Sequence, residues 1–337
     1  MIQKPNLTID DIARELGVSK TTVSRAISGK GRISAATRER VQAFIALHNY
    51  RPNAAAKGLA ESRTYNLALV LPRDFINLDV PFVRKSMSAI CEEAFTHDYN
   101  VMVCLSTDDQ TAHLIRTLDY RKVDAVLLTR TVENDALLQI LVSRGMPFAT
   151  LGSLPARNHG DAVVEADHDQ TGGCYAFSKL LLEKAAGKTA LLGNDLNYIV
   201  NQSRMSGFRK ACQELELPLE QTPIRIGINS LPSCRAAVEE LLSAGVRRFI
   251  CMDEDVCMRT FEVLTSNGLS VPEDVELASL SDSDQLQRSD PPISALRFDG
   301  AELGRVACRE LLKSLNNEPY DPTPLLGFEI QLRKSTL

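Results

Sequence analysis

The sequence contains no tryptophan, and its eight cysteines form no CxxC pair; Cys251 and Cys257 are the nearest two. Dense cysteine spacing is typical of small secreted domains held together by disulfides, so this scattered set predicts reduced thiols. No apolar run approaches the roughly 18 residues that a membrane-spanning helix needs. The N-terminal MIQKPNLTIDD also lacks the apolar stretch of a signal peptide. We therefore expect a cytoplasmic protein that is neither secreted nor embedded in a membrane.

Sequence signatures of common nucleotide-binding and hydrolytic enzymes are also missing. No GxGxxG follows an apolar strand pattern, and neither GxxxxGK[ST] nor GxSxG occurs. Of the five histidines only His168, in EADHDQTGG, lies near carboxylates. We expect it in a surface loop or helix start, with Asp169 and Thr171 capping the amphipathic helix that follows. The sequence thus predicts no catalytic residues, no metal site and no cofactor.

The net charge is modest but unevenly distributed. The 337 residues carry a formal charge of −5, and 44% of them are hydrophobic, as in an ordinary globular protein. Residues 1–62 contain ten basic and five acidic side chains, which leaves 28 basic and 38 acidic ones in the remainder. A basic head on an acidic body indicates a module that binds a polyanion, joined to a part that does not.

Residues 7–50 carry helical patterns only. The expected helices run from Thr8 to Leu16, from Ser19 to about Ser28, and from Ser34 to the break at Asn49–Pro52. Each begins at a serine or threonine, which are preferred N-caps. Gly17 and Gly29 end the first two helices, because glycine readily adopts the positive φ of such a stop. The apolar positions expected to pack together are Ile9, Ile12, Ala13, Leu16, Val18, Val23, Ala26, Ile27, Val41, Phe44, Ile45 and Leu47.

The second expected helix has an unusual surface. A helix that needs only solubility is more usually rich in Glu and Lys, whereas short hydrogen-bonding side chains and cations suit phosphates and base edges. The turn at Gly17, between the small Ala13 and the apolar Val23, fits a helix-turn-helix. We predict that this head binds DNA, with a protein-docking module as the alternative. The outward residues of GVSKTTVSRAISG are Ser19, Lys20, Thr21, Thr22, Ser24 and Arg25.

The segment NAAAKGLAES, residues 53–62, is expected to lie between coil and helix. Its three alanines favour a helix and Asn53 suits an N-cap, but Gly58 costs about 1 kcal/mol. Helices shorter than about 12–15 residues are marginal in water. We therefore expect a linker that becomes helical only when something stabilises it, and that Gly58 makes easier to melt.

From Tyr65 onward, short apolar strands alternate with amphipathic helices, which predicts parallel sheets covered on both faces. Two such series indicate two lobes of similar build, with a ligand cleft beyond the carboxyl ends of their strands. The last two strands indicate that the chain crosses back between the lobes before it ends. The expected strands are 66–72, 99–105, 123–128, 147–152, 162–166, 188–193, 224–228, 247–252, 275–280, 293–298 and 325–332.

The segments LTIDDIARELGVSKTTVSRAISG and RISAATRERVQAFIALHNYRPNAAAKGLA closely resemble the N-terminal headpiece of the lactose-repressor (LacI/GalR) family, and the remainder resembles the family's core in pattern. The resemblance implies a homodimeric DNA-binding transcriptional regulator, usually a repressor. Its fold would be an all-α helix-turn-helix headpiece plus an α/β core of two parallel-sheet lobes, like periplasmic sugar-binding proteins. The implied parts are a headpiece at 1–52, a hinge helix at 53–63 and a core at 64–337, with an N-lobe at about 64–165 plus 292–322 and a C-lobe at about 166–291 plus 323–337.

The resemblance also implies which residues meet the double-stranded operator. Lys20 and Thr21 match the major-groove pair that varies with operator sequence, beside Ser19. Arg25 matches a position that bonds guanine or phosphate. Leu59 matches the leucine that wedges into the minor groove when the hinge folds; the alternative is a flexible tether with Leu59 packed on the core. The expected phosphate anchors are Thr8, Ser24, Tyr50 and Asn53, and Thr22 is either a contact or a helix-surface filler.

In the family, a small molecule binds between the lobes, usually a sugar, a sugar derivative or a nucleobase. Arg204, in QSRMSGFRKA, matches the arginine that bonds ligand oxygens, and its planar fork suits vicinal hydroxyls or a phosphate. Asp253 matches a polar cleft position. Phe82 and Phe298 match positions that line the pocket, where an aromatic ring can stack on a sugar, although either fits an ordinary core equally well.

Two departures from the family pattern leave the ligand class open. The usual ligand aspartate falls at Ser281 in SLSDSDQLQRSDPP, so either Asp282, one place later, takes its role or the ligand differs. Gly152 stands where lactose-responsive members have an acid. With fewer carboxylates, a sugar phosphate or another anionic ligand becomes conceivable beside a neutral sugar.

Only RKSTL follows the last expected strand, without a leucine heptad, so we expect a dimer and no tetramer. Two alternatives to an effector-controlled regulator remain. A solute-binding protein would share the core, but the basic head and the missing signal peptide argue against it. An α/β enzyme with a regulatory head is the other, although no catalytic motif supports it.

Overall fold

The computed structural model forms two compact units, residues 1–64 and 65–337. The residues that the structure describes are 7–29, 31–48, 50, 54–72, 81–106, 112–155, 163–184, 187–218 and 220–337, with backbone alone at 54–57. Within these residues, no helix is long and apolar enough to cross a membrane.

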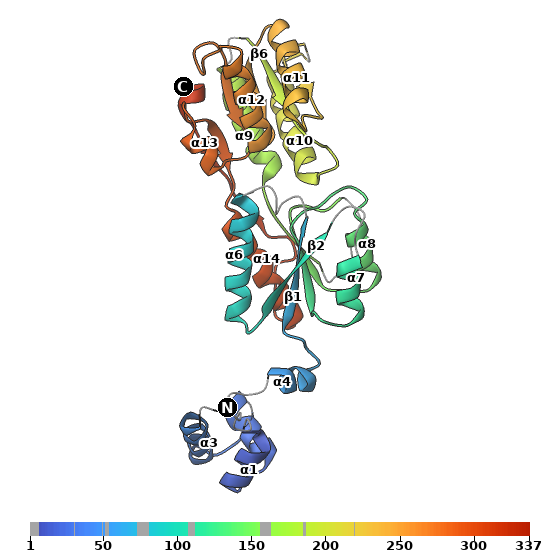
Figure 1. The fold of residues 1–337 in the computed structure, drawn as a ribbon, viewed down its shortest axis with the longest axis vertical. Helices are drawn as coiled ribbons and strands as arrows, with labels where there is room; N and C mark the ends of the chain where they lie inside the picture. The colour runs from blue at the N-terminus through green and yellow to red at the C-terminus, as the bar shows by residue number, and fades with distance from the viewer. Residues whose placement is uncertain are drawn as a thin grey trace, which may run out of the picture. The chain divides into compact units, whose positions relative to one another are not determined.

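Three helices build most of the first unit, as predicted (Figure 1). Their bounds are α1 Ile9–Leu16, α2 Lys20–Ser28 and α3 Ala35–Leu47. The predicted N-caps Thr8, Ser19 and Ser34 each accept a hydrogen bond from a backbone N–H of the first turn. Gly17 and Gly29 end α1 and α2 with φ of 63° and 70°, the left-handed region that glycine enters at no steric cost.

The three helices share one small apolar core. Phe44 and Ile45 of α3 pack against its edge, but Leu47 is 78% exposed, so its predicted burial is wrong. Leu47 follows Ile45 by two residues, roughly 200° around the helix, and therefore lies on the opposite face. The fully buried members of this core are Ile12, Ala13, Val23, Ala26 and Val41.

The linker segment is helical in the structure, as α4 (Ala54–Glu61). Ser62 takes a left-handed φ of 53°, and the N–H of Arg63 donates to the Gly58 carbonyl at 2.9 Å, which is the long bond of a Schellman stop. A Cβ on Gly58 would lie 2.5 Å from the Arg63 carbonyl oxygen. Gly58 therefore permits a close backbone approach in addition to weakening the helix.

The first lobe of the second unit contains a six-stranded sheet in the order β11-β5-β4-β3-β1-β2, parallel throughout. Helices α6 (Pro81–Thr96) and α14 (Gly300–Leu315) cover one face, and α7 (Ala112–Asp119) and α8 (Ala136–Ser143) the other (Figure 1). The strands are β1 Asn66–Pro72, β2 Asn100–Ser106, β3 Ala125–Leu128, β4 Phe148–Leu151, β5 Val163–His168 and β11 Leu325–Leu326.

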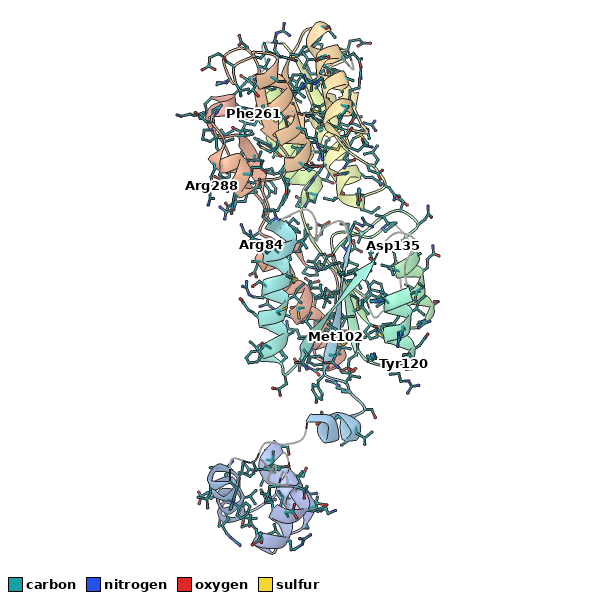
Figure 2. All side chains as sticks on the ribbon, viewed as in Figure 1. Arg84, Met102, Tyr120, Asp135, Phe261 and Arg288 are labelled. Carbon is teal, nitrogen blue, oxygen red and sulfur yellow. The ribbon has the colours of Figure 1, made fainter. Side chains whose placement is uncertain are left out.

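The second lobe repeats this design with the order β12-β10-β9-β8-β6-β7, in which only β12 is antiparallel to its neighbour. Its helices are α9 Gln170–Glu183 and α10 Ile199–Glu214 on one face, α11 Leu231–Ser243 and α12 Glu254–Ser266 on the other, then α13 Asp284–Arg288 and the 3-10 turn Lys334–Thr336. The strands are β6 Lys188–Leu192, β7 Ile224–Arg225, β8 Val246–Cys251, β9 Glu276–Ser279, β10 Ser294–Arg297 and β12 Glu329–Gln331. Side chains fill the layers between sheets and helices in both lobes (Figure 2).

The chain passes between the lobes three times: from β5 to α9, from β10 to α14, and from β11 to β12. The expected bounds assigned residues 292–322 to the first lobe and 323–337 to the second. In the structure, β10 (Ser294–Arg297) belongs to the second sheet and β11 (Leu325–Leu326) to the first, so both bounds lie later in the chain. The expected single strand at 325–332 is two strands in different sheets, divided where Gly327 and Phe328 cross between them. An apolar run alone does not indicate which sheet a strand joins.

Candidate DNA-binding surface and effector site

Helix α2 buries one side and exposes the other. Val23 and Ala26, three residues apart, lie against α1 and α3, and this fixes which face of the helix points to solvent. Five predicted DNA contacts are exposed, and Thr22 is half-buried. The exposed five are Ser19, Lys20, Thr21, Ser24 and Arg25, which the i, i+4 spacing gathers on one surface.

The start of α2 is held by a hydroxyl pair. Ser19 Oγ accepts the Thr22 N–H at 3.1 Å and lies 2.8 Å from Thr22 Oγ1. This cap fixes the direction in which the first turn of α2 leaves the Gly17 stop. Ser19 and Thr22 therefore serve the fold of the helix-turn-helix whether or not they also touch DNA.

The two cations of this surface are placed differently. The Lys20 ammonium lies 2.5 Å from a carboxylate oxygen of Asp10, and both side chains are largely exposed. Such surface pairs contribute only about 0–1 kcal/mol, so a phosphate can replace the carboxylate. The Arg25 stem lies over Gly31, where a Cβ would be 3.0 Å from Arg25 Cδ. Gly31, at a φ of 88°, thereby lets the arginine cross the loop after α2.

Of the predicted phosphate anchors outside α2, two are described. Thr8 is exposed, and its hydroxyl and backbone N–H both donate to Asp11 Oδ2, at 2.6 and 3.0 Å, in a capping box. Tyr50 is half-buried against the headpiece core, and this burial raises the pKa of its phenol. Asn53 lies outside the described residues.

Leu59 on α4 is 85% exposed. Within the first unit, which the structure describes by itself, its side chain therefore stays outside the headpiece core. A large apolar side chain left exposed on a helix of eight residues is costly unless a partner covers it.

In the second unit the polar candidates gather where parallel strands end. In each sheet the strand order reverses beside one strand: β1 lies between β2 and β3, and β6 between β7 and β8. Crevices beyond the carboxyl ends of strands at such points are where parallel α/β sheets bind ligands. Asp253 lies two residues after the end of β8 and N-caps α12, accepting the Val256 N–H at 2.8 Å.

Arg204, on α10, is buried beside the same strand end. Its Nη1 donates to the Met252 carbonyl at 2.7 Å and its Nε to Gln170 Oε1 at 3.4 Å. Burial raises the pKa of Asp253, and the positive charge of Arg204 offsets only part of this rise. Arg204 and Asp253 are therefore close enough to act together on one ligand.

Two further buried carboxyls, which the sequence analysis did not select, experience the charge of Arg204. Asp167, at the end of β5, accepts the Ser153 N–H and hydroxyl at 2.8 and 2.6 Å. Burial raises the pKa of both Asp167 and Glu254, again against the effect of Arg204. One buried guanidinium thus acts on three carboxyl groups, of which Asp167 belongs to the first lobe and Asp253 and Glu254 to the second.

His168 is the main residue that sequence reasoning placed wrongly. It is the last residue of β5 and only 2% exposed, not part of a surface loop. Asp169 does cap α9, as predicted, but Thr171 lies inside the helix. The apolar run that ends in Ala166 could have predicted this position, because the two residues after such a run lie at the carboxyl end of a buried parallel strand.

Phe82 and Phe298 both lie against this histidine. The ring centroid of His168 is 6.2 Å from that of Phe82, at the start of α6, and 5.2 Å from that of Phe298, after β10. Both phenylalanines are half-buried. Phe82 and Phe298 were predicted pocket residues and come from elements far apart in the sequence. The structure places both beside His168, which was not predicted to be part of the site.

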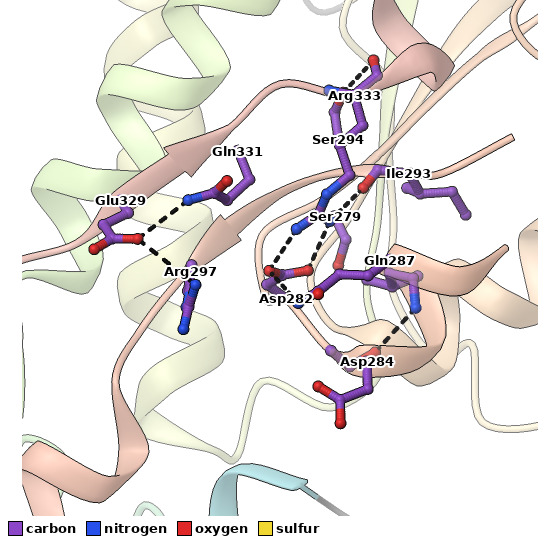
Figure 3. Close-up of polar contacts among 12 residues, drawn as sticks. Ser279, Asp282, Asp284, Gln287, Ile293, Ser294, Arg297, Glu329, Gln331 and Arg333 are labelled. Atoms are coloured by element: carbon purple, nitrogen blue, oxygen red, sulfur yellow. Dashed lines mark hydrogen bonds and ion pairs between the residues drawn. The ribbon is translucent and has the colours of Figure 1, made fainter.

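Asp282 is already bound within the second lobe (Figure 3). Its two carboxylate oxygens accept from Arg333 Nη1 and Nη2 at 2.8 and 2.7 Å, and its side chain is only 2% exposed. Arg333 also donates to the Ile293 carbonyl at 2.6 Å, which ties the chain end to β10. The expected ligand role of Asp282 would require breaking a buried two-bond ion pair.

The second departure, Gly152, has a backbone reason. Its φ is 123°, a region in which L side chains are strained, and its N–H donates to the Ala166 carbonyl at 2.7 Å. Ser281, the other departure, donates its N–H to Ser279 Oγ at 3.2 Å. An acid at position 152 would therefore need a different path of the chain after β4.

A pocket of about 210 Å³ opens at the carboxyl ends of the first sheet. It contains none of the five predicted effector residues. Asp135, which N-caps α8 (Figure 2), forms one side, and Asn197 of the second lobe contributes to the other. The remaining lining residues are Val70, Pro72, Ser106, Leu128, Thr129, Arg130, Val132, Glu133, Asn134, Ala136 and Leu137.

Beside this pocket, the segment after β3 clasps the start of α10. The N–H of Glu133 donates to the Asn197 carbonyl at 2.9 Å, and the N–H of Ile199 to the Thr131 carbonyl at 3.2 Å. Arg130 donates to the Tyr198 hydroxyl at 3.1 Å and lies 5.1 Å from the centre of its ring. These contacts, called the clasp below, join the two lobes in this conformation. In the part of the chain that the structure describes, no group of three or more His, Cys, Asp or Glu is arranged to hold a metal ion.

The Asp282–Arg333 pair predicts a strong effect on stability. Arg333→Ala should lower the free energy of unfolding of the second unit by about 3–5 kcal/mol, because it leaves a buried carboxylate without its partner. Arg288→Ala, on the exposed α13, is the control and should change it by less than about 0.5 kcal/mol. Urea unfolding measures both, and equal values would contradict the importance of the pair.

The buried His168 predicts a pH dependence. Burial lowers the pKa of its imidazole from 6.5 to about 4, although the nearby Asp299 acts in the opposite direction. As the pH falls, His168 therefore binds a proton in the unfolded chain at a higher pH than in the folded protein. The free energy of unfolding consequently decreases between about pH 6.5 and 4. Relative to His168→Phe, the wild type should lose about 2 kcal/mol of unfolding free energy from pH 7 to 4.5. His113→Phe, at an exposed position on α7, keeps the buried His168 and should therefore retain this loss of stability.

Comparison with known proteins connects these features to a family. The family model "Bacterial regulatory proteins, lacI family" matches residues 8–53, and "Periplasmic binding protein-like domain" matches residues 179–336. Catabolite control protein A of Priestia megaterium is 27% identical over 338 residues, covering 98% of this chain and 99% of that protein.

Solved structures of other regulators match the fold of almost the whole chain. The transcriptional regulator CelR–cellobiose complex has a TM-score of 0.70 and 25% identity, covering 98% of this chain and 99% of that one. The lac repressor dimer bound to operator and the anti-inducer ONPF has a TM-score of 0.77 at 22% identity, covering 99% and 100%, and shows the shared fold. With its helix-turn-helix unit and its two parallel-sheet lobes, the chain joins a lacI-family DNA-binding domain to a periplasmic-binding-protein-like domain, which is the organisation of a DNA-binding transcriptional regulator.

Proposed function

We propose that this regulator is a repressor, which binds a palindromic operator as a homodimer and changes its operator affinity when a sugar or sugar derivative binds between the lobes of the second unit. The observation that carries the proposal is the exposed polar face of α2. Its cations and hydroxyls project from a helix whose other side is fixed by Val23 and Ala26. These groups match the donors that read base edges and phosphates in the major groove.

The hinge helix supplies the second contact. Leu59 is exposed on α4, where a leucine wedge could enter the minor groove and unstack a base step. Unstacking costs a few kcal/mol, which the additional contacts of bent DNA offset. The Schellman stop at Ser62 and Arg63 would set where this helix ends when it folds on the operator.

An edge strand supports the homodimer. β2 is the outer strand of the first sheet, and Figure 2 labels its residue Met102. Its Val103 and Leu105 are 50% and 39% exposed. Apolar side chains along an open sheet edge invite pairing with another chain. A second copy that covers this edge would give a dimer with two headpieces, one for each half-site of a palindrome, and such half-sites lie about one helical turn apart.

For the effector we retain Arg204, Asp253, Phe82 and Phe298. Arg204 and Asp253 supply a fork of donors and an acceptor at one strand end, and the two rings offer partly exposed faces on which a sugar can stack. A related regulator is solved as a complex with cellobiose, which supports this ligand class. Asp282 is no longer part of the proposed site, because both of its oxygens bind Arg333.

The clasp suggests how binding is transmitted. An effector that fits only one arrangement of the lobes shifts the population toward it, and an effector that binds both arrangements equally shifts nothing. The hydrogen bonds of Thr131 and Glu133 to the start of α10 would form or break in this shift. The first lobe, which continues directly from the hinge segment, would then alter the formation of α4 on DNA.

Operator binding tests the DNA part of the proposal. Arg25→Ala should weaken binding to a selected palindromic site by about 5- to 150-fold at fixed salt, because it removes a base or phosphate contact. Arg288→Ala, on the second unit, should leave binding unchanged. Fluorescence anisotropy with the palindrome, a single half-site and random duplex measures this. Equal affinity for all three duplexes would contradict both sequence-specific binding and the dimer.

Ligand binding tests the effector part. Five compounds are tested separately for an increase in the Tm of the protein. They are glucose, ribose, cellobiose, glucose 6-phosphate and ribose 5-phosphate. A compound at 100 times its Kd should stabilise the second unit by about 2.7 kcal/mol. Arg204→Gln should abolish the increase, whereas Arg209→Gln, an exposed arginine of the same helix, should retain it. An increase that both variants retain would exclude Arg204 from the site.

A further inference from the structure

We infer that His168 is a specificity-determining residue of the effector site, and that its Nδ1 accepts a hydrogen bond from a hydroxyl or amino group of the ligand. This inference rests on the proposed effector function. It goes beyond that proposal by assigning a residue to the site and a chemical requirement to the ligand.

The first argument is an unpaired atom. His168 is 2% exposed, yet its Nδ1 has no hydrogen-bond partner among the residues that the structure describes. Leaving a buried polar atom without a partner is costly, and in native proteins such an atom usually has a functional or solvent partner. Two aromatic rings, Phe82 and Phe298, lie beside it and provide no hydrogen-bonding group of their own.

The second argument concerns the protonation of the ring. Burial lowers the pKa of the imidazole to about 4, so the ring is neutral at pH 7. We place the single ring proton on Nε2. A neutral imidazole that carries its proton on Nε2 presents a lone pair at Nδ1. The free atom is thus an acceptor, which requires a donor on the ligand.

The third argument is position. His168 pairs with Leu326 where β5 and β11 end, and the next residue, Asp169, donates its N–H to the Leu326 carbonyl at 2.8 Å. The chain crosses between the lobes from β5 and again after Phe298. A ligand stacked on the partly exposed rings of Phe82 and Phe298 would therefore touch the first lobe and two of the crossings together.

The fourth argument is charge. The backbone N–H of His168 donates to Asp167 Oδ1 at 2.7 Å, and Asp167, Asp253 and Glu254 all experience the charge of Arg204, with Arg259 also acting on Asp253. With an acceptor at Nδ1 as well, this region contains more acceptors than donors. It should favour a neutral or amino-bearing polyol over its phosphorylated form, which departs from the anionic ligand that the sequence left open.

The experiment uses the full chain and two readouts. With ¹⁵N-histidine labelling, Nδ1 of His168 should show an unprotonated, neutral nitrogen at pH 7, assigned by its loss in His168→Phe. Calorimetry then compares glucose with glucose 6-phosphate and ribose with ribose 5-phosphate, together with cellobiose. The neutral member of a pair should bind more tightly, and His168→Phe should weaken its binding by about tenfold or more. His113→Phe should bind as the wild type does.

Deoxy analogues of the best ligand locate the hydrogen bond. Loss of the relevant hydroxyl should weaken binding to the wild type but not to His168→Phe, because the two changes remove the same interaction. Binding that His168→Phe leaves unchanged, a proton on Nδ1, or a preference for the phosphorylated sugar would each overturn the inference while the proposed effector function stands. If no compound of the panel binds the wild type, the proposed sugar effector itself fails, and the inference fails with it.

Discussion

The common direction of the strands determines where the second unit can have chemistry. Because all strands except β12 run parallel within their sheets, their carboxyl ends lie together, and polar residues stand at or just after several of these ends. Asp167 and His168 end β5, and Asp253 follows β8. Helices cover the faces of both sheets, so the strand ends are where buried polar groups meet a ligand at least cost in unsatisfied hydrogen bonds.

Most of the fold could be predicted because it depends on local rules. Capping residues and glycine stops set the bounds of α1 and α2. Continuous apolar runs marked most strands within one or two residues, although β7 ends three residues before the predicted position 228. The predictions that were wrong concern residues whose surroundings depend on the three-dimensional fold. Leu47 has the same chemistry as its buried neighbours and differs only in its angle around α3. The run at 325–332 is apolar in both halves, and only the crossing at Gly327 assigns them to different sheets.

The candidate site was predictable only in part, for a related reason. Residue type and spacing selected Arg204, Asp253, Phe82 and Phe298, and the structure places Arg204 with Asp253 and both rings against one histidine. It was not possible to foresee that Asp282 is bound by Arg333, 51 residues later in the chain. A carboxylate whose partner is distant in sequence looks the same as a free one. The burial of His168 was likewise hidden, because polar neighbours on both sides made its segment resemble a loop.

The three crossings between the lobes have a consequence for synthesis of the protein on the ribosome. The headpiece helices contact only one another within the first unit, so this unit can fold as soon as it emerges. The first lobe lacks α14 and β11, and the second lacks β12, until nearly the entire chain has been translated. The nascent chain therefore carries a finished DNA-binding module for most of its elongation, attached to two sheets that are still incomplete and whose apolar faces are not yet fully covered.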